Sequence, residues 1–203
     1  AERSATSTPL HLFQEASYPD LHDWGERNRT LANLVGFQTE RVNLQAAGQA
    51  TVAIAAPVYG DLFATLGVQP RLGRGFDSSR EGSDPAVAVL SDTLWQKLFQ
   101  ADPGAIGRLL SVDGIAHRIV GIMPPGFGFP HMAADLWVPL EAPKETGMMA
   151  QQARAEADLG IVARLRPGVS VAQAQADLSG IQSSIAQQYG KLDLASGVTS
   201  MRL

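Results

Sequence analysis

The sequence predicts an α+β fold in which a discontinuous strand–helix–strand domain carries a small β-rich insertion. Three observations support this. Both ends of the chain combine alternating apolar residues with apolar residues at helical spacing. The middle shows short apolar runs between glycine- and proline-rich turns, and one run contains an Asp-Gly hairpin signal. We expect residues 1–68 plus 136–203 to form the discontinuous domain and residues 69–135 to form the insertion.

The chain opens with a short strand over residues 11–16, followed by a helix start. Ser17 is the expected N-cap and Asp20 stands at the reciprocal position of a capping box. Apolar residues then continue at loosely helical spacing: Leu21, Trp24, Leu31 and Leu34.

Two strands and a short helix are expected next. Residues 35–45 and 50–58 are typical of strands joined by a hairpin loop at 46–49. Asp61 and Gly67 are the expected cap and stop of two helical turns.

The middle third favours compact β structure. Residues 86–91 predict a buried strand, and residues 91–99 a short helix capped by Ser91 or Asp92. Residues 108–123 predict a hairpin that turns at Asp113-Gly114. Residues 124–132 are expected to be irregular because of their prolines and glycines, and residues 134–140 extended.

The last third predicts a strand over residues 158–166 and a long helix. Ser170 is its expected N-cap, with Gln173 completing a capping box. The helix presents one apolar stripe up to Tyr189: Val171, Ala174, Leu178, Ile181 and Ile185. A final strand is expected over residues 197–203.

Composition excludes several classes of function. The 203 residues are 45% hydrophobic and 18% charged, with a formal net charge of −4, which argues against nucleic-acid binding. The absence of cysteine excludes disulfides and thiolate metal sites. No signal-peptide pattern or apolar span of about 20 residues occurs, so the sequence as given reads as a soluble domain.

The glycine-rich segment 66–76 invites comparison with a phosphate-binding loop. It contains Gly67, Gly73 and Gly75 together with two arginines. No P-loop motif is present, and no helix pattern follows the glycines. A turn-rich joint is therefore favoured over an anion site.

No catalytic or metal motif was found, so we expect no catalytic residue, metal or cofactor. The histidines are scattered, at His11, His22, His117 and His131, and no G-x-S-x-G motif occurs. The loop 77–84 gathers serines and carboxylates. A soluble hydrolase that joins Ser78 or Ser83 to a distant histidine is therefore one alternative reading.

An apolar loop at residues 121–132 is the more useful candidate. Phe127, Phe129 and Met132 are the candidate partner-interface residues, because apolar side chains at a loop tip can form a binding patch. The alternative is that these side chains pack beneath the loop as a satellite core. A stand-alone interaction module that uses this loop is a further alternative.

Several motifs in order resemble the MacB-like periplasmic core domain of ABC-transporter permeases, especially large duplicated permeases. The most specific are F-x-x-L-G-V-x-P-x-x-G-R-x-F at 63–76, L-S-x-x-L-W at 90–95 and D-P-x-x-I-G-R at 102–108. "SYPDLHDW" at 17–24 and "ARLRPGVSVAQAQADL" at 163–178 extend the resemblance to nearly the whole chain.

The resemblance implies a non-enzymatic domain outside the cytoplasmic membrane, with a porter-like α/β subdomain and an inserted second subdomain. Implied partners are transmembrane permease helices of the parent chain, a separate cytoplasmic ATPase, and an adaptor protein or a lipid or peptide cargo. Such a domain transmits ATP-driven movement, and we expect the isolated domain to be a monomer. By the same analogy, segment 66–76 is the crossover between subdomains, anchored by Leu66 and Phe76.

Overall fold

The computed structural model describes residues 9–79, 84–130, 134–140, 158–189 and 201–202. The chain divides into two compact units, residues 1–36 with 142–203 (unit 1) and residues 37–141 (unit 2). The α+β class predicted from the sequence is confirmed, with a discontinuous first unit around an inserted second one.

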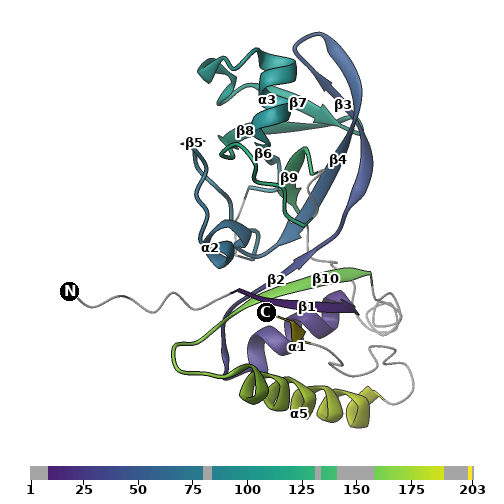
Figure 1. The fold of residues 1–203 in the computed structure, drawn as a ribbon. Helices are drawn as coiled ribbons and strands as arrows, with labels where there is room; N and C mark the ends of the chain where they lie inside the picture. Colours follow the sequence, from purple (N-terminus) through teal and green to yellow (C-terminus); the bar gives the residue numbers. More distant parts are fainter. Residues whose placement is uncertain (1–8, 80–83, 131–133, 141–157, 190–200, 203) are drawn as a thin grey trace, which may run out of the picture. The chain divides into compact units, whose positions relative to one another are not determined.

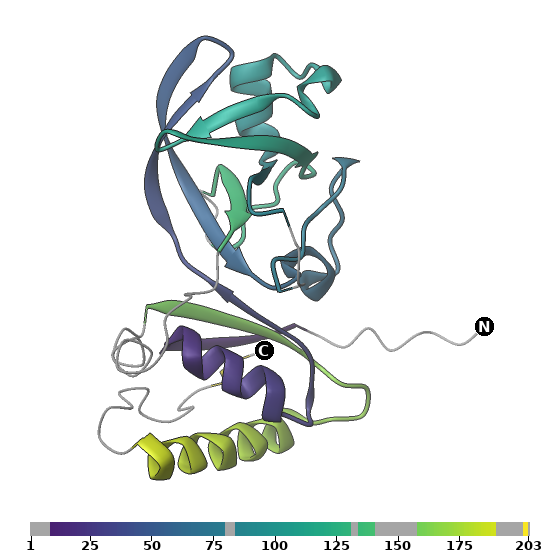
Figure 2. The same cartoon turned by 180° about the vertical axis from the view of Figure 1, so that it is seen from behind.

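Unit 1 pairs four strands in the order β11-β1-β10-β2 and places two helices on one face of them (Figures 1 and 2). Its strands are β1 (Pro9–Ala16), β2 (Leu31–Phe37), β10 (Leu159–Leu165) and β11 (Met201–Arg202). Its helices are α1 (Tyr18–Arg27) and α5 (Val171–Tyr189), which lie side by side.

Both helices of unit 1 begin where their sequences indicate. Ser17 and Asp20 form the capping box of α1, and both residues are fully buried. At α5, the Ser170 and Gln173 side chains each accept the other residue's backbone N–H, at 3.3 and 2.8 Å respectively. The expected stripe packs inward, because Ala174, Leu178, Ile181 and Ile185 are buried.

The first helix is shorter than its apolar spacing suggested. Asn28 ends α1, since its Nδ2 donates to the Trp24 carbonyl at 2.7 Å and its Oδ1 accepts from Leu31 N–H at 2.9 Å. Leu31 and Leu34 therefore belong to β2 rather than to the helix.

Unit 2 contains a closed ring of six paired strands. The path β4-β3-β7-β8-β6-β9 returns to β4 through a parallel β4–β9 pairing. The ring strands are β3 (Glu40–Ala46), β4 (Gln49–Tyr59), β6 (Val87–Leu90), β7 (Leu109–Val112), β8 (Ile115–Ile122) and β9 (Leu136–Pro139). Because the ring of strands is closed, most of its strands pair on both sides and few strand edges are left unpaired.

Short elements complete unit 2. They are α2 (Leu62–Leu66), β5 (Leu72–Gly73), α3 (Asp92–Phe99) and a 3₁₀ turn (Pro103–Ala105). The Asp61 cap, the Ser91 cap and the Asp113-Gly114 turn are confirmed; both turn residues have positive φ, as a tight hairpin requires.

The boundaries between the units differ from those that the sequence suggested, 68/69 and 135/136. Strands β3 and β4 pair with β7 and β9, respectively, inside the ring. Residues 37–68 therefore group with the inserted unit, which begins at residue 37 and ends at residue 141. This long-range pairing has no local sequence signal.

Candidate interaction surfaces

Aromatic side chains gather beside the 121–130 loop of unit 2. The ring centroid of Phe127 lies 5.1 Å from that of Trp137 and 6.4 Å from that of Phe63. Phe63 also meets Phe76 edge-on at 5.6 Å. These separations are typical of favourable aromatic pairs, so Phe127 packs against an aromatic cluster and stays half-buried.

The second aromatic residue of the loop is held separately. Phe129 packs edge-on against Phe37 at 5.0 Å, and its carbonyl oxygen accepts the Trp137 indole N–H at 2.8 Å. Phe127 and Phe129 are both half-buried, and their role as partner-interface residues stays a prediction. Pro125 and Gly126 form the exposed tip of the loop. Met132 lies outside the described residues.

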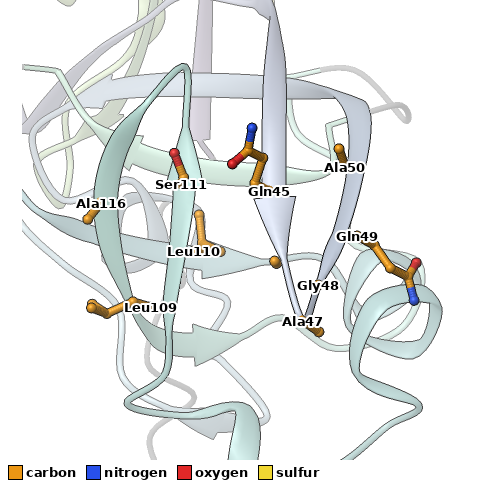
Figure 3. Close-up of a pocket in the computed structure, with 10 residues that line it drawn as sticks. Gln45, Ala47, Gly48, Gln49, Ala50, Leu109, Leu110, Ser111 and Ala116 are labelled. Atoms are coloured by element: carbon orange, nitrogen blue, oxygen red, sulfur yellow. The ribbon is translucent and has the colours of Figure 1, made fainter.

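A shallow groove of about 500 Å³ lies between the β3–β4 turn and β7 (Figure 3). Its lining is uncharged and includes Gln45, Gln49, Ala50, Leu109, Ser111 and Ala116. The groove exists because the register of the β3–β7 ladder contains only Leu44↔Val112 and Gln45↔Ser111 before the strands diverge. Leu109 is 63% exposed there. This lining offers amide and hydroxyl hydrogen bonds beside apolar surface, and no acid or base.

Segment 66–76 is built to pack against β8. Gly73 has φ +71°, and a Cβ there would overlap the Val120 carbonyl oxygen. Around it, the Arg71 and Arg74 N–H groups each donate to a β8 carbonyl at 2.8 Å. The glycines therefore permit close approach of two backbones, which agrees with a joint rather than an anion site.

Arg71, one of the two arginines of this segment, makes its contacts within the fold. Arg71 Nη1 lies 2.7 Å from Asp92 Oδ1, and the guanidinium stacks 5.4 Å above the Trp95 ring. The whole segment lies in unit 2, so the expected crossover between subdomains is wrong at this place. Phe76 does anchor the segment, through its contact with Phe63.

The serine-rich loop does not assemble a hydrolase site among its described residues. The Ser78 hydroxyl donates to the Val58 carbonyl at 2.7 Å and accepts the Gly60 N–H at 3.0 Å. Asp77 accepts the Ser79 N–H at 3.0 Å. These contacts shape the turn. Ser83 lies outside the described residues.

The histidines are likewise dispersed. His117 is buried, and its Nδ1 lies 3.0 Å from the Ile115 carbonyl, while His22 lies 3.8 Å from Glu26 on α1. His131 lies outside the described residues. The described part of the chain holds no group of three metal-ligating side chains.

One carboxyl group is electrostatically perturbed. Partial burial and the nearby Asp113 carboxylate raise the pKa of Glu40 from its ordinary value of 4.5. Asp113 itself is held by Asn43, whose backbone N–H and side-chain Nδ2 donate to it at 2.8 and 3.0 Å.

Sequence reasoning missed the polar links from α5 to α1 and to the connection between α1 and β2. The buried Trp24 indole donates to Gln182 Oε1 at 2.9 Å. Asp177 accepts the Arg29 N–H at 2.8 Å and the Thr30 hydroxyl at 2.9 Å. Gln182 follows Ile181 of the apolar stripe, and this position could have indicated such a link, since a buried amide requires a hydrogen-bond partner.

Among the described residues, no helix combines the length and the apolar character that crossing a bilayer requires.

A two-unit α+β module with a closed inserted ring is the class that this fold defines. The family model described as "MacB-like periplasmic core domain" matches residues 6–181. The chain belongs to this family, and the resemblance seen in its motifs is confirmed. It is an extracytoplasmic domain of a MacB-like ABC-transporter permease, a component of a transporter.

Solved structures show the same fold at low sequence identity. The periplasmic region of MacB from Actinobacillus actinomycetemcomitans aligns with a TM-score of 0.65 and 13% identity, covering 93% of this chain and 86% of that one. The extracellular domain of the noncanonic ABC-type transporter YknZ from Gram-positive bacteria gives 0.61 and 12%, covering 90% and 95%.

A third structure, a domain of a putative permease protein from Porphyromonas gingivalis, gives a TM-score of 0.62 and 14% identity, covering 92% of this chain and 81% of that one. No curated protein matches the sequence.

Proposed function

We propose that this domain is a non-enzymatic transmission element of its permease. ATP-driven movement of the transmembrane helices and their ATPase displaces the domain, in which unit 1 moves as a rigid body, and the domain passes that displacement to an adaptor protein or to a lipid or peptide cargo. Family membership supplies the permease context.

The observation that supports rigidity most directly is the buried tie between α1 and α5. Trp24 and Gln182 stand 158 positions apart in sequence, yet their side chains are hydrogen-bonded inside unit 1. A buried, satisfied polar pair fixes the relative positions of two helices, because any slip leaves an unpaired donor.

The loop 121–132 is the proposed contact for the partner. The aromatic packing of Phe127 and Phe129 fixes the base of the loop, and the exposed Pro125-Gly126 tip stands beyond it. Changing Phe127 and Phe129 to serine together is expected to weaken partner binding. Val52→Ser on β4 serves as the control, because Val52 is apolar and 62% exposed.

The proposal is tested in the parent permease assembled with its ATPase. The natural domain has no cysteine, so Ser184→Cys on the exposed side of α5 supplies one thiol per domain. ATP is expected to change the yield of a thiol cross-linker between two copies, and an ATPase-dead partner to abolish the change. Equal yields with and without ATP would count against transmission.

A further inference from the structure

The two ends of the described chain meet on one strand. His11 pairs with Arg202 and Leu12 with Met201, so β11 lies antiparallel along one edge of β1. The other edge of β1 pairs antiparallel with β10, from Pro9↔Arg164 to Ala16↔Leu159. The start of β1 therefore lies beside the last described residues of the chain.

This arrangement responds differently to two directions of force. Hydrogen bonds in an antiparallel ladder lie perpendicular to the strands, so sliding one strand along its axis strains them all together. Pulling the strands apart from one end strains them one after another. The register of β1 and β10 contains five partner pairs, with an irregularity between Leu12 and Ala16.

We propose that β1 is the force-receiving strand of the domain, built to take load in shear from both chain ends together. This inference rests on the proposed transmission function, and it takes the flanking permease segments to pull on both chain ends in one direction. Drawn in one direction, β1 and β11 move together and slide against β10. Drawn apart, the two ends peel β11 from β1 at only two partner pairs.

Force applied to β1 can pass through bonded and packed residues to both helices of unit 1. Strand β1 ends at the fully buried Ala16, and the next residue, the fully buried Ser17, caps α1. On the other side, β10 leads through the Ser170 cap into α5. The Trp24–Gln182 hydrogen bond joins the two branches of this path.

Single-molecule pulling of the 203-residue chain tests the inference. One handle is fixed to the N-terminus and the other to a single introduced cysteine, placed either by Asp158→Cys or by Arg166→Cys. Both positions are exposed. Position 158 precedes β10 and loads the β1–β10 ladder in shear, whereas position 166 follows β10 and peels the same ladder.

At equal loading rate, the rupture force is expected to be at least about twofold higher for the Asp158→Cys attachment, because forced unfolding follows the barrier along the pulling direction. Equal forces, or a lower force at position 158, would overturn the inference. Matching thermal melts of the two variants verify that both are folded. The measurement involves no ATPase, so its failure leaves the cross-linking test of transmission standing, and the reverse also holds.

Discussion

Trp24 on α1 and Gln182 on α5 form a buried hydrogen bond of 2.9 Å between the indole N–H and the amide oxygen. Both side chains are at most 5% exposed. The bond joins the two helices that cover the sheet of unit 1, and its two residues lie 158 positions apart in the sequence.

Gln182→Leu is expected to lower the free energy of unfolding of the chain by about 1–3 kcal/mol, because the Trp24 N–H loses its partner without gaining water. Urea denaturation followed by circular dichroism measures the loss. Gln187→Leu is the matched control, since Gln187 is exposed on the same helix. Equal effects of the two substitutions would show that the buried bond contributes nothing specific.

Gly73→Ala tests the close packing of β5 on β8. Gly73 and Gly126 both have positive φ, but only at Gly73 does a Cβ meet a backbone carbonyl, that of Val120. Gly126→Ala is expected to cost about 1 kcal/mol through backbone strain alone. Gly73→Ala should cost more than twice as much.

Hydrogen exchange locates the damage from Gly73→Ala. The Arg71 and Arg74 amides, which donate to β8, should lose protection first. If the two alanine variants melt at the same temperature, the close approach of the backbones is not what requires glycine.

Glu40→Gln is expected to stabilise the protein slightly at pH 7. Partial burial and Asp113 raise the pKa of Glu40 in the folded state, so the folded protein binds this proton more tightly than the unfolded chain does. The favourable contribution of Glu40 is therefore complete below its ordinary pKa of 4.5 and is lost as pH rises through the raised value.

Solvent screening limits the gain from Glu40→Gln to about 0.3 kcal/mol at pH 7, and the gain should vanish below about pH 4. Urea titrations at several pH values measure it. In an Asp113→Asn background the gain should shrink, because one of the two causes of the raised Glu40 pKa is then removed. A gain that persists unchanged at low pH would contradict the assigned cause.

Local signals predicted the caps and turns of this fold well, because the hydrogen bonds and backbone angles that form them involve only a few neighbouring residues. The capping boxes at Ser17 and Ser170 and the Asp113-Gly114 turn each depend on neighbours in sequence. Leu31 and Leu34 were wrongly predicted to continue the first helix, because their apolar spacing stays helical beyond the Asn28 cap.

Long-range pairing could not be predicted in the same way. Residues 37–68 join unit 2 because β3 and β4 pair with strands far along the chain. The apolar character of Phe127 and Phe129 was evident, yet their burial depends on Trp137, Phe63 and Phe37, which no spacing rule brings together. The partner-interface role of the loop 121–132 stays a prediction.

The central claim is that unit 1 of the domain moves without deforming. Spin labels at Glu26→Cys and Ser184→Cys, both exposed in unit 1, report on distances within one domain. A single Ser184→Cys label reports on the distance between two copies in the parent permease. Upon ATP binding, we expect the distance between copies to shift while the Glu26–Ser184 distance stays the same. A change within unit 1 as large as that between copies would contradict rigid transmission.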